Sequence, residues 1–126
     1  MVVHRVLLAE DNTDAARVIA ELINDEPDLE CTGVVSTPGG ILAALETQPV
    51  DALLLDLELG HESGITVLAE CRRRFPEVAI FVLSGHANPA LMTEARARGA
   101  HDYLVKPEDL EVLVTRLRSI IKDHAE

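Results

Sequence analysis

The sequence contains very few aromatic side chains: one Tyr, two Phe and no Trp in 126 residues. Because 48% of the residues are hydrophobic but only 2% are aromatic, the core has to be built from Val, Leu, Ile and Ala. A chain of this length is the size of one domain and buries roughly two thirds of its unfolded surface. We therefore expect a single domain, residues 1–126, that folds without disulfides or a structural metal.

Membrane and export signals are also missing. No apolar run approaches the roughly 20 residues that cross a bilayer. Residues Met1 to Ala9 lack the long apolar region and the small-residue cleavage site of an export signal. Cys31 and Cys71 have no metal-ligand spacing and are expected to be buried, reduced thiols. These absences favour a cytoplasmic protein with no membrane partner.

Basic side chains are scarce, with 11 Lys and Arg against 22 Asp and Glu and a net charge of −11. Such a surface repels phosphate backbones, which argues against direct nucleic-acid binding by this chain. The one basic run, Arg72 to Arg74, falls where a helix is expected to end. There it complements the helix dipole, which we favour over a binding patch.

Several hydrolase and nucleotide-binding motifs are absent. There is no Gly-rich phosphate loop. His61-Glu62 lacks the second His of a zinc-protease helix, and the segment Gly60 to Gly64 has its Ser one place too late for a nucleophile elbow.

What the chain does have is a regular alternation of short apolar runs with segments of helical period. The runs are short, and the third and fourth lack polar alternation, which is typical of strands buried on both faces of a parallel sheet. They are Val6–Ala9, Cys31–Val35, Ala52–Leu57, Val78–Leu83 and Tyr103–Val105. The first helical segment has the apolar stripe Ala15, Val18, Ile19, Leu22 and Ile23. The pattern predicts a doubly wound (βα)₅ α/β domain.

Three residues mark helix ends in this pattern. Asn12 and Asn88 are expected to cap helices, and Gly99 to end one.

Polar residues end these strands. Glu10 and Asp11 follow the first, and Asp56, Ser84 and Lys106 close the third, fourth and fifth. In an open parallel sheet all strands end at one edge, which is where such folds bind ligands. We therefore expect these five side chains to lie together.

Their chemistry points to phosphoryl transfer. Three clustered carboxylates repel one another and need a cation, and hard oxygen ligands suit Mg²⁺. Lys106 adds a positive charge and Ser84 a hydroxyl donor. An Asp beside Mg²⁺ and a Lys is a plausible nucleophile toward phosphorus, giving an acyl phosphate.

On these residues the sequence resembles, over its whole length, the CheY-like receiver domain of bacterial response regulators. The matching features are Glu10-Asp11, Leu53 to Asp56, Gly64, Ser84-Gly85, Gly99-Ala100 and Tyr103 to Pro107. The resemblance implies a flavodoxin-like five-stranded parallel sheet of order 2-1-3-4-5. It implies a two-component phosphorelay switch rather than an enzyme, with at most slow autodephosphorylation. Its partners would be a histidine kinase or phosphotransfer protein and a downstream target or output domain.

The resemblance also implies a role for each site residue. Asp56 would be the phosphoacceptor, and Asp11 a direct Mg²⁺ ligand. Glu10 would hold a metal-bound water, and the backbone carbonyl of Glu58 would complete the metal site. Ser84 and Lys106 would bind the phosphoryl oxygens. Tyr103 would be the ring that turns inward as Ser84 moves, changing the surface around Leu91, Met92, Glu94, Tyr103 and Val112.

The sequence departs from the family at three places. Leu59-Gly60 replaces the common Met-Pro pair, so the loop after Asp56 is expected to be more flexible. Ser84 replaces the commoner Thr. Glu58 and His86, two residues after Asp56 and Ser84, are unusual and are expected to tune the lifetime of the phosphorylated state.

Two alternatives remain. The chain could be a receiver domain excised from a longer transcriptional regulator or hybrid kinase. It could also be an aspartate-nucleophile phosphatase, since Asp56-Leu57-Glu58 resembles that signature, but Glu58 stands where a second Asp is needed and no cap domain is present.

Overall fold

The computed structural model describes residues 2–59, 62–85, 88–106 and 110–125. Within them, strands and helices alternate along the chain as β1 (His4–Ala9), α1 (Thr13–Asn24), β2 (Leu29–Val35), α2 (Pro38–Thr47), β3 (Ala52–Asp56), α3 (Gly64–Arg74), β6 (Ala79–Ser84), α4 (Pro89–Ala97), β7 (Asp102–Val105) and α5 (Leu110–Ala125). Between β3 and α3 lie two short strands, β4 (Glu58–Leu59) and β5 (Glu62–Ser63).

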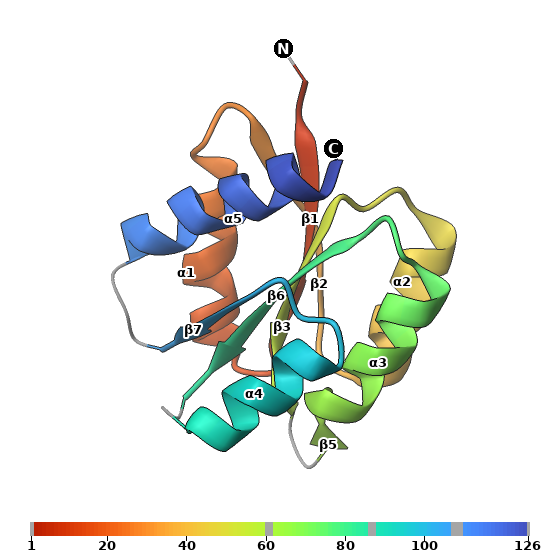
Figure 1. Ribbon diagram of the computed structural model, residues 1–126. Helices are drawn as coiled ribbons and strands as arrows, with labels where there is room; N and C mark the ends of the chain where they lie inside the picture. Colours follow the sequence, from red (N-terminus) through yellow and green to blue (C-terminus); the bar gives the residue numbers. More distant parts are fainter. Residues whose placement is uncertain (1, 60–61, 86–87, 107–109, 126) are drawn as a thin grey trace.

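The main sheet has five parallel strands in the order β2-β1-β3-β6-β7. Counted by chain order within this sheet, that is 2-1-3-4-5, so the expected doubly wound fold is confirmed. We call the side at which the strands end the carboxyl edge and the opposite side the amino edge. In Figure 1 the carboxyl edge is at the bottom, whereas both chain termini lie at the top.

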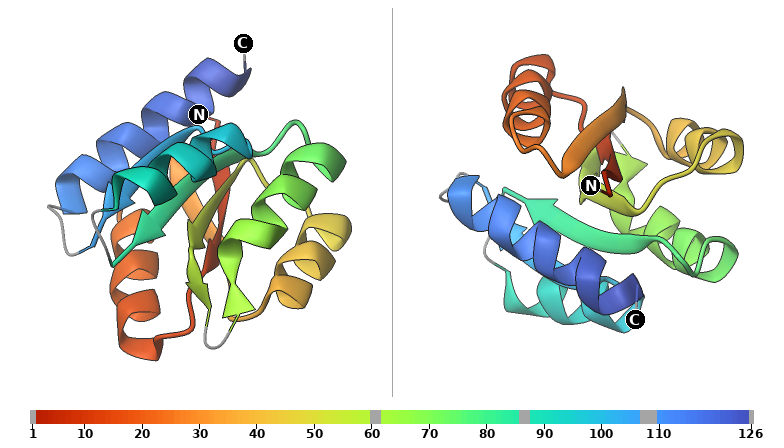
Figure 2. Two further views of the ribbon diagram at one scale, coloured as in Figure 1. Left: turned by 60° about the horizontal axis from the view of Figure 1, so that its bottom comes forward. Right: turned by 90° about the horizontal axis from the view of Figure 1, so that it is seen from above.

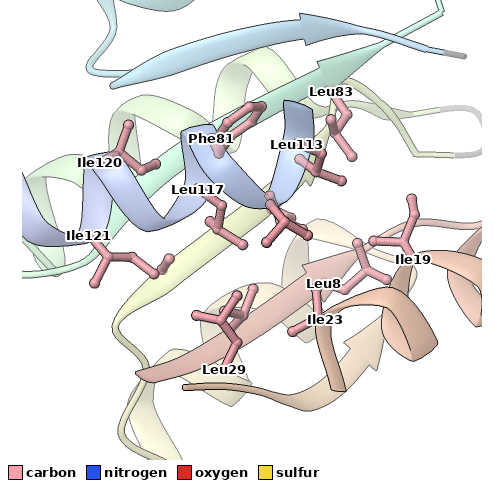
Figure 3. Packing of buried hydrophobic residues seen from close by; sticks show 14 of the residues in the cluster. Leu8, Ile19, Ile23, Leu29, Phe81, Leu83, Leu113, Leu117, Ile120 and Ile121 are labelled. Carbon is pink, nitrogen blue, oxygen red and sulfur yellow. The ribbon is translucent and has the colours of Figure 1, made fainter. Parts of the chain in front are cut away.

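Helices cover both faces of the sheet (Figure 2). Buried side chains of α1 and α5 pack on one face, and those of α2, α3 and α4 on the other. Figure 3 shows the first of these layers, in which Leu117 of α5 and Ile23 of α1 meet Leu8 and Phe81 of the sheet. Among the described residues, the buried hydrophobic side chains are aliphatic apart from Cys71, Phe81 and Tyr103, in keeping with the composition.

The predicted helix ends are confirmed. The side chain of Asn12 accepts a hydrogen bond from the Ala15 backbone N–H, and that of Asn88 accepts from Ala90 and Leu91. Gly99 has a φ of 118°, the left-handed conformation that glycine adopts most easily. The basic run ends α3 at Arg74.

The predicted stripe of α1 is wrong at Val18. The helix buries Ala16, Ile19 and Ile23, whereas Ala15 and Leu22 are half-buried and Val18 is 46% exposed. The buried positions are spaced three and four residues apart, which places them on one narrow face of the helix. Val18 lies outside that face.

Two other expectations concern Cys and membranes. Both Cys residues are free, but only Cys71 is buried, and burial raises the pKa of its thiol to about 11. Cys31 is half-buried. Among the described residues, no helix has the length and apolar character needed to span a bilayer.

Candidate functional site

The five strand-end residues come together at the carboxyl edge. Glu10, Asp56 and Ser84 are buried, with 2%, 3% and 0% exposure. Lys106 is half-buried and Asp11 is exposed. Two carboxylates inside an aliphatic protein are costly unless they are paired or hydrogen-bonded. Packing of the hydrophobic core therefore does not explain the polar groups at this edge.

Lys106 bridges the two buried carboxylates. Its Nζ lies 2.7 Å from Glu10 Oε1 and 3.0 Å from Asp56 Oδ2. Its backbone N–H donates to the Ser84 carbonyl at 2.7 Å, which continues the pairing of β7 with β6 beyond Val105. The ladder thus delivers the ammonium group to the edge. The direct contact between Lys106 and Glu10 was not predicted from the sequence.

The protonation equilibria of this cluster are shifted. Burial, followed by the hydrogen bond and charge of Asp56, raises the pKa of Glu10 to about 7 even though Lys106 opposes the rise. Burial alone would lower the pKa of Lys106, but its hydrogen bonds to Glu10 and Asp56 raise it instead. The site therefore holds more negative charge than one ammonium group compensates.

A cation could relieve that excess. Glu10, Asp11 and Asp56 each offer a carboxylate oxygen, and these oxygens all lie within 4.8 Å of one another. An all-oxygen donor set with one exposed member suits Mg²⁺, which prefers carboxylates and retains several waters. The residues present fit the expected ion.

The flexibility expected of the loop after Asp56 stays a prediction, and Gly60 and His61 of that loop lie outside the described residues. On either side of them the backbone forms an antiparallel pair, with Glu58 opposite Ser63 and Leu59 opposite Glu62. Leu59 is 2% exposed and belongs to the same buried cluster as Val67 and Leu68 of α3. The Glu58 N–H donates to Asp56 Oδ1 at 2.9 Å. Glu58 is therefore held by both pairing and a hydrogen bond.

Gly64 allows α3 to begin against this strand. A Cβ at Gly64 would lie 2.8 Å from the Asp56 carbonyl oxygen and 3.0 Å from Leu57 Cα, closer than side chains approach backbone. The Gly64 N–H donates to the Leu57 carbonyl at 2.8 Å. Only glycine fits this approach without a shift of the segment that carries Asp56.

Two further expected residues keep their roles as predictions. Tyr103 is only 2% exposed, so its ring lies inside the protein in this structure. His86 lies outside the described residues. Glu58 is exposed, and its Oε1 would lie 3.7 Å from a Cβ on Gly85, which precedes His86.

One cation near the site was missed. Arg17 of α1 lines the same open hollow, about 450 Å³, as Glu10, Asp11 and Val34. Its guanidinium is 3.5 Å from the Asp14 carboxylate. The only signal in the sequence was its position in the helix directly after the acidic pair, which by itself is common on helix surfaces.

Comparison with known proteins agrees with this geometry. A family model described as the response regulator receiver domain matches residues 6–118. The chain is 32% identical over 115 residues to the putative response regulator NtrX-like of Rickettsia bellii, covering 90% of this chain and 24% of that protein. It is 29% identical over 128 residues to a protein-glutamate methylesterase/protein-glutamine glutaminase of Bradyrhizobium diazoefficiens, covering 96% and 35% respectively.

The fold is also found in solved structures. A CheY-like receiver domain protein of Methanospirillum hungatei superposes with a TM-score of 0.89 at 20% identity, covering 98% of this chain and 97% of that one. By contrast, the chain spans about a quarter to a third of the two curated relatives above.

Proposed function

Because this chain belongs to the response regulator receiver domain family, we propose that it is a phosphoacceptor switch of a two-component phosphorelay, modified on Asp56. The observation that carries the proposal is the pairing of Asp56 with Lys106 at 3.0 Å, beside Glu10 and Asp11. Asp56 is a buried carboxylate that both faces a cation and belongs to an oxygen cluster able to hold a second one.

In this proposal, an Asp56 oxygen forms a bond to phosphorus as the bond from phosphorus to the donor breaks, and the donor keeps that electron pair. The product is an acyl phosphate. Lys106 moves from a carboxylate to a phosphoryl oxygen, and the Ser84 hydroxyl donates to another. The Glu58 N–H already orients Asp56 through Oδ1.

The metal site would consist of Asp11, Asp56 and the backbone carbonyl of Glu58, with Glu10 holding a metal-bound water. Mg²⁺ in that position would neutralise charge on the transferring oxygens. Asp11→Ala is expected to weaken Mg²⁺ binding and, without metal, to stabilise the fold because one repelling carboxylate is removed.

The partners follow from the same proposal. The phosphodonor would be a histidine kinase or phosphotransfer protein in the cytoplasm, and the output would be a change at α4, β7 and α5 that alters binding of a downstream protein. Because the chain spans only part of its curated relatives, it could also be the receiver of a longer regulator. We expect no nucleic-acid or membrane contact by this domain and no turnover of external phosphate esters.

The test is modification with a small phosphodonor and Mg²⁺, followed by intact mass. Wild type should gain one phosphoryl group and Asp56→Asn none. Asp51→Asn is the matched control, because Asp51 precedes the same strand at the amino edge, where it accepts the Arg5 N–H at 2.7 Å. Phosphorylation of Asp56→Asn to the wild-type extent would refute the assignment.

A further inference from the structure

A second polar cluster lies at the amino edge of the sheet, the edge opposite Asp56. It joins the end of α3, the start of β6, the residue before β7 and the last turn of α5. Its members are His101, His124, Arg72 and the backbone of Pro76 and Ile80. In Figure 1 the end of α5 lies at the top of the molecule, at the amino edge.

His101 is fixed by two hydrogen bonds with one residue of β6. Its backbone N–H donates to the Ile80 carbonyl at 2.7 Å, and the Ile80 N–H donates to His101 Nδ1 at 2.9 Å. A ring nitrogen that accepts cannot carry a proton, so His101 is held neutral with its hydrogen on Nε2. The His101 side chain thereby accepts the backbone hydrogen of Ile80 where the pairing of β6 with β7 begins.

His124 attaches the last turn of α5 to the same place. Its Nε2 lies 2.7 Å from the Pro76 carbonyl oxygen, to which it donates its hydrogen. Its ring meets the His101 ring edge to face, with centroids 4.4 Å apart and planes at 69°. Arg72 donates to the same Pro76 carbonyl at 2.9 Å. One carbonyl therefore ties α3 and α5 together next to His101.

The charges around His101 oppose its protonation. Arg72 from α3 and His124 from α5 are the nearby cationic groups, and Asp123 of α5 lines the same hollow of about 200 Å³. Burial, followed by the charges of His124 and Arg72, lowers the pKa of His101. The carboxylate of Asp123 does not reverse that direction.

The tautomer also argues against a metal site. With Nδ1 of His101 accepting a backbone hydrogen and Nε2 protonated, the ring has no lone pair left for an ion. Nε2 of His124 is likewise used by Pro76.

We propose that His101 and His124 form an acid-sensitive contact, which we call the latch. It holds the last turn of α5 at the amino edge and breaks when His101 takes up a proton. On protonation Nδ1 becomes a donor that faces the Ile80 N–H donor, and the buried N–H loses its acceptor. The resulting imidazolium lies beside a guanidinium and a second imidazole. The His101 ring then has to move away from the Ile80 N–H, and His124 loses the ring against which it packs.

This latch is independent of the proposed phosphorylation, since it involves none of the residues at the carboxyl edge. It makes the docking of α5 depend on pH. Because Asp56→Asn leaves the cluster intact, that variant should show the same pH response as wild type, whether or not Asp56 is the phosphoacceptor.

The test is amide exchange by NMR between about pH 8 and about pH 5, the range in which histidine titrates, expressed as protection relative to the intrinsic rate at each pH. As the pH falls, Ile80 and residues 119–124 should lose protection, whereas Ala16 to Ile23 of α1 should keep it. His101→Asn retains an acceptor without a titrating group and should abolish the change. His4→Asn removes a histidine at the start of β1 and should respond as wild type does.

Equal protection of Ile80 and residues 119–124 at both pH values in wild type would overturn the latch, and so would an unchanged response in His101→Asn. If that variant does not fold, the imidazole nitrogens of wild type decide. We expect the Nε2–H tautomer for His101 and a titration below that of free imidazole. An Nδ1–H tautomer, or a titration at or above the free value, would contradict the proposal.

Discussion

Lys106 Nζ lies 2.7 Å from Glu10 Oε1, a contact that joins residues 96 positions apart. The Glu10 side chain is 1% exposed and that of Lys106 29%. The carboxylate is therefore enclosed by protein, whereas the ammonium group reaches it from the solvent side. The pair links β1 to β7, which are separated in the sheet by β3 and β6.

The first prediction concerns the pH dependence of stability. Because the pKa of Glu10 is raised to about 7 from its ordinary 4.5, the folded protein binds more protons than the unfolded chain between these values. Stability should therefore be highest below about pH 4.5 with respect to this group and fall as the pH rises to about 7, by on the order of 3 kcal/mol. Urea unfolding without divalent metal measures it.

Glu10→Gln should remove this decline, because its amide does not titrate, and it should exceed wild type in stability at neutral pH. Glu30→Gln, at an exposed position of β2, is the matched control and should keep the wild-type slope. If Glu10→Gln and wild type show the same slope, the enclosed carboxylate is not its source.

The second prediction concerns the start of α3. In Gly64→Ala the new Cβ would meet the Asp56 carbonyl at 2.8 Å, and overpacking of this kind costs about 1–3 kcal/mol. Since the strain acts on the segment that carries Asp56, phosphorylation should slow as well. Gly39→Ala in α2 is the control, because nothing lies within 4 Å of its Cβ, and it should be neutral or stabilising. Equal unfolding free energies for the two variants would contradict the close-contact argument.

The fold could be predicted because its signals are repeated along the chain. Each buried strand is a short apolar run, and the caps Asn12 and Asn88 mark two helix starts in the sequence itself. The gathering of Glu10, Asp56 and Lys106 at one edge follows from parallel topology alone. No knowledge of side-chain positions was needed for it.

What could not be predicted depends on packing between distant segments. Leu59 of β4 is buried, but a single leucine after Asp56 does not reveal from the sequence whether it turns toward the core. The contact of Lys106 with Glu10 depends on the length of β7, since one residue more or less would move the ammonium group away from the pair.

The third prediction uses Tyr103, the only Tyr in a chain without Trp, so that tyrosine emission reports on this ring alone. Because the ring is 2% exposed, acrylamide should quench its emission weakly before activation and also with Mg²⁺ and beryllofluoride present. The change on activation should instead appear in amide exchange of α4, which buries only Ala95. Strong quenching of the free protein, or exchange changes confined to α1 and α2, would contradict this.

The last prediction concerns the lifetime of the acyl phosphate. Hydrolysis needs a water in line behind phosphorus, and we expect Glu58, whose Oε1 would lie 3.7 Å from a Cβ on Gly85, to flank the path of that water. We expect protonated His86 to pair with Glu58 and to obstruct the water. An exposed ion pair contributes up to about 1 kcal/mol, so His86→Ala should accelerate dephosphorylation by up to about fivefold. The wild-type rate should rise with pH as the imidazole loses its charge.

Glu58→Gln separates the two roles of the carboxylate, because loss of an obstructing pair accelerates hydrolysis, whereas loss of a group that orients water slows it. His4→Ala, far from the site, should match wild type. A His86→Ala rate no faster than wild type, together with a rate independent of pH across the histidine range, would show that no such pair controls the lifetime.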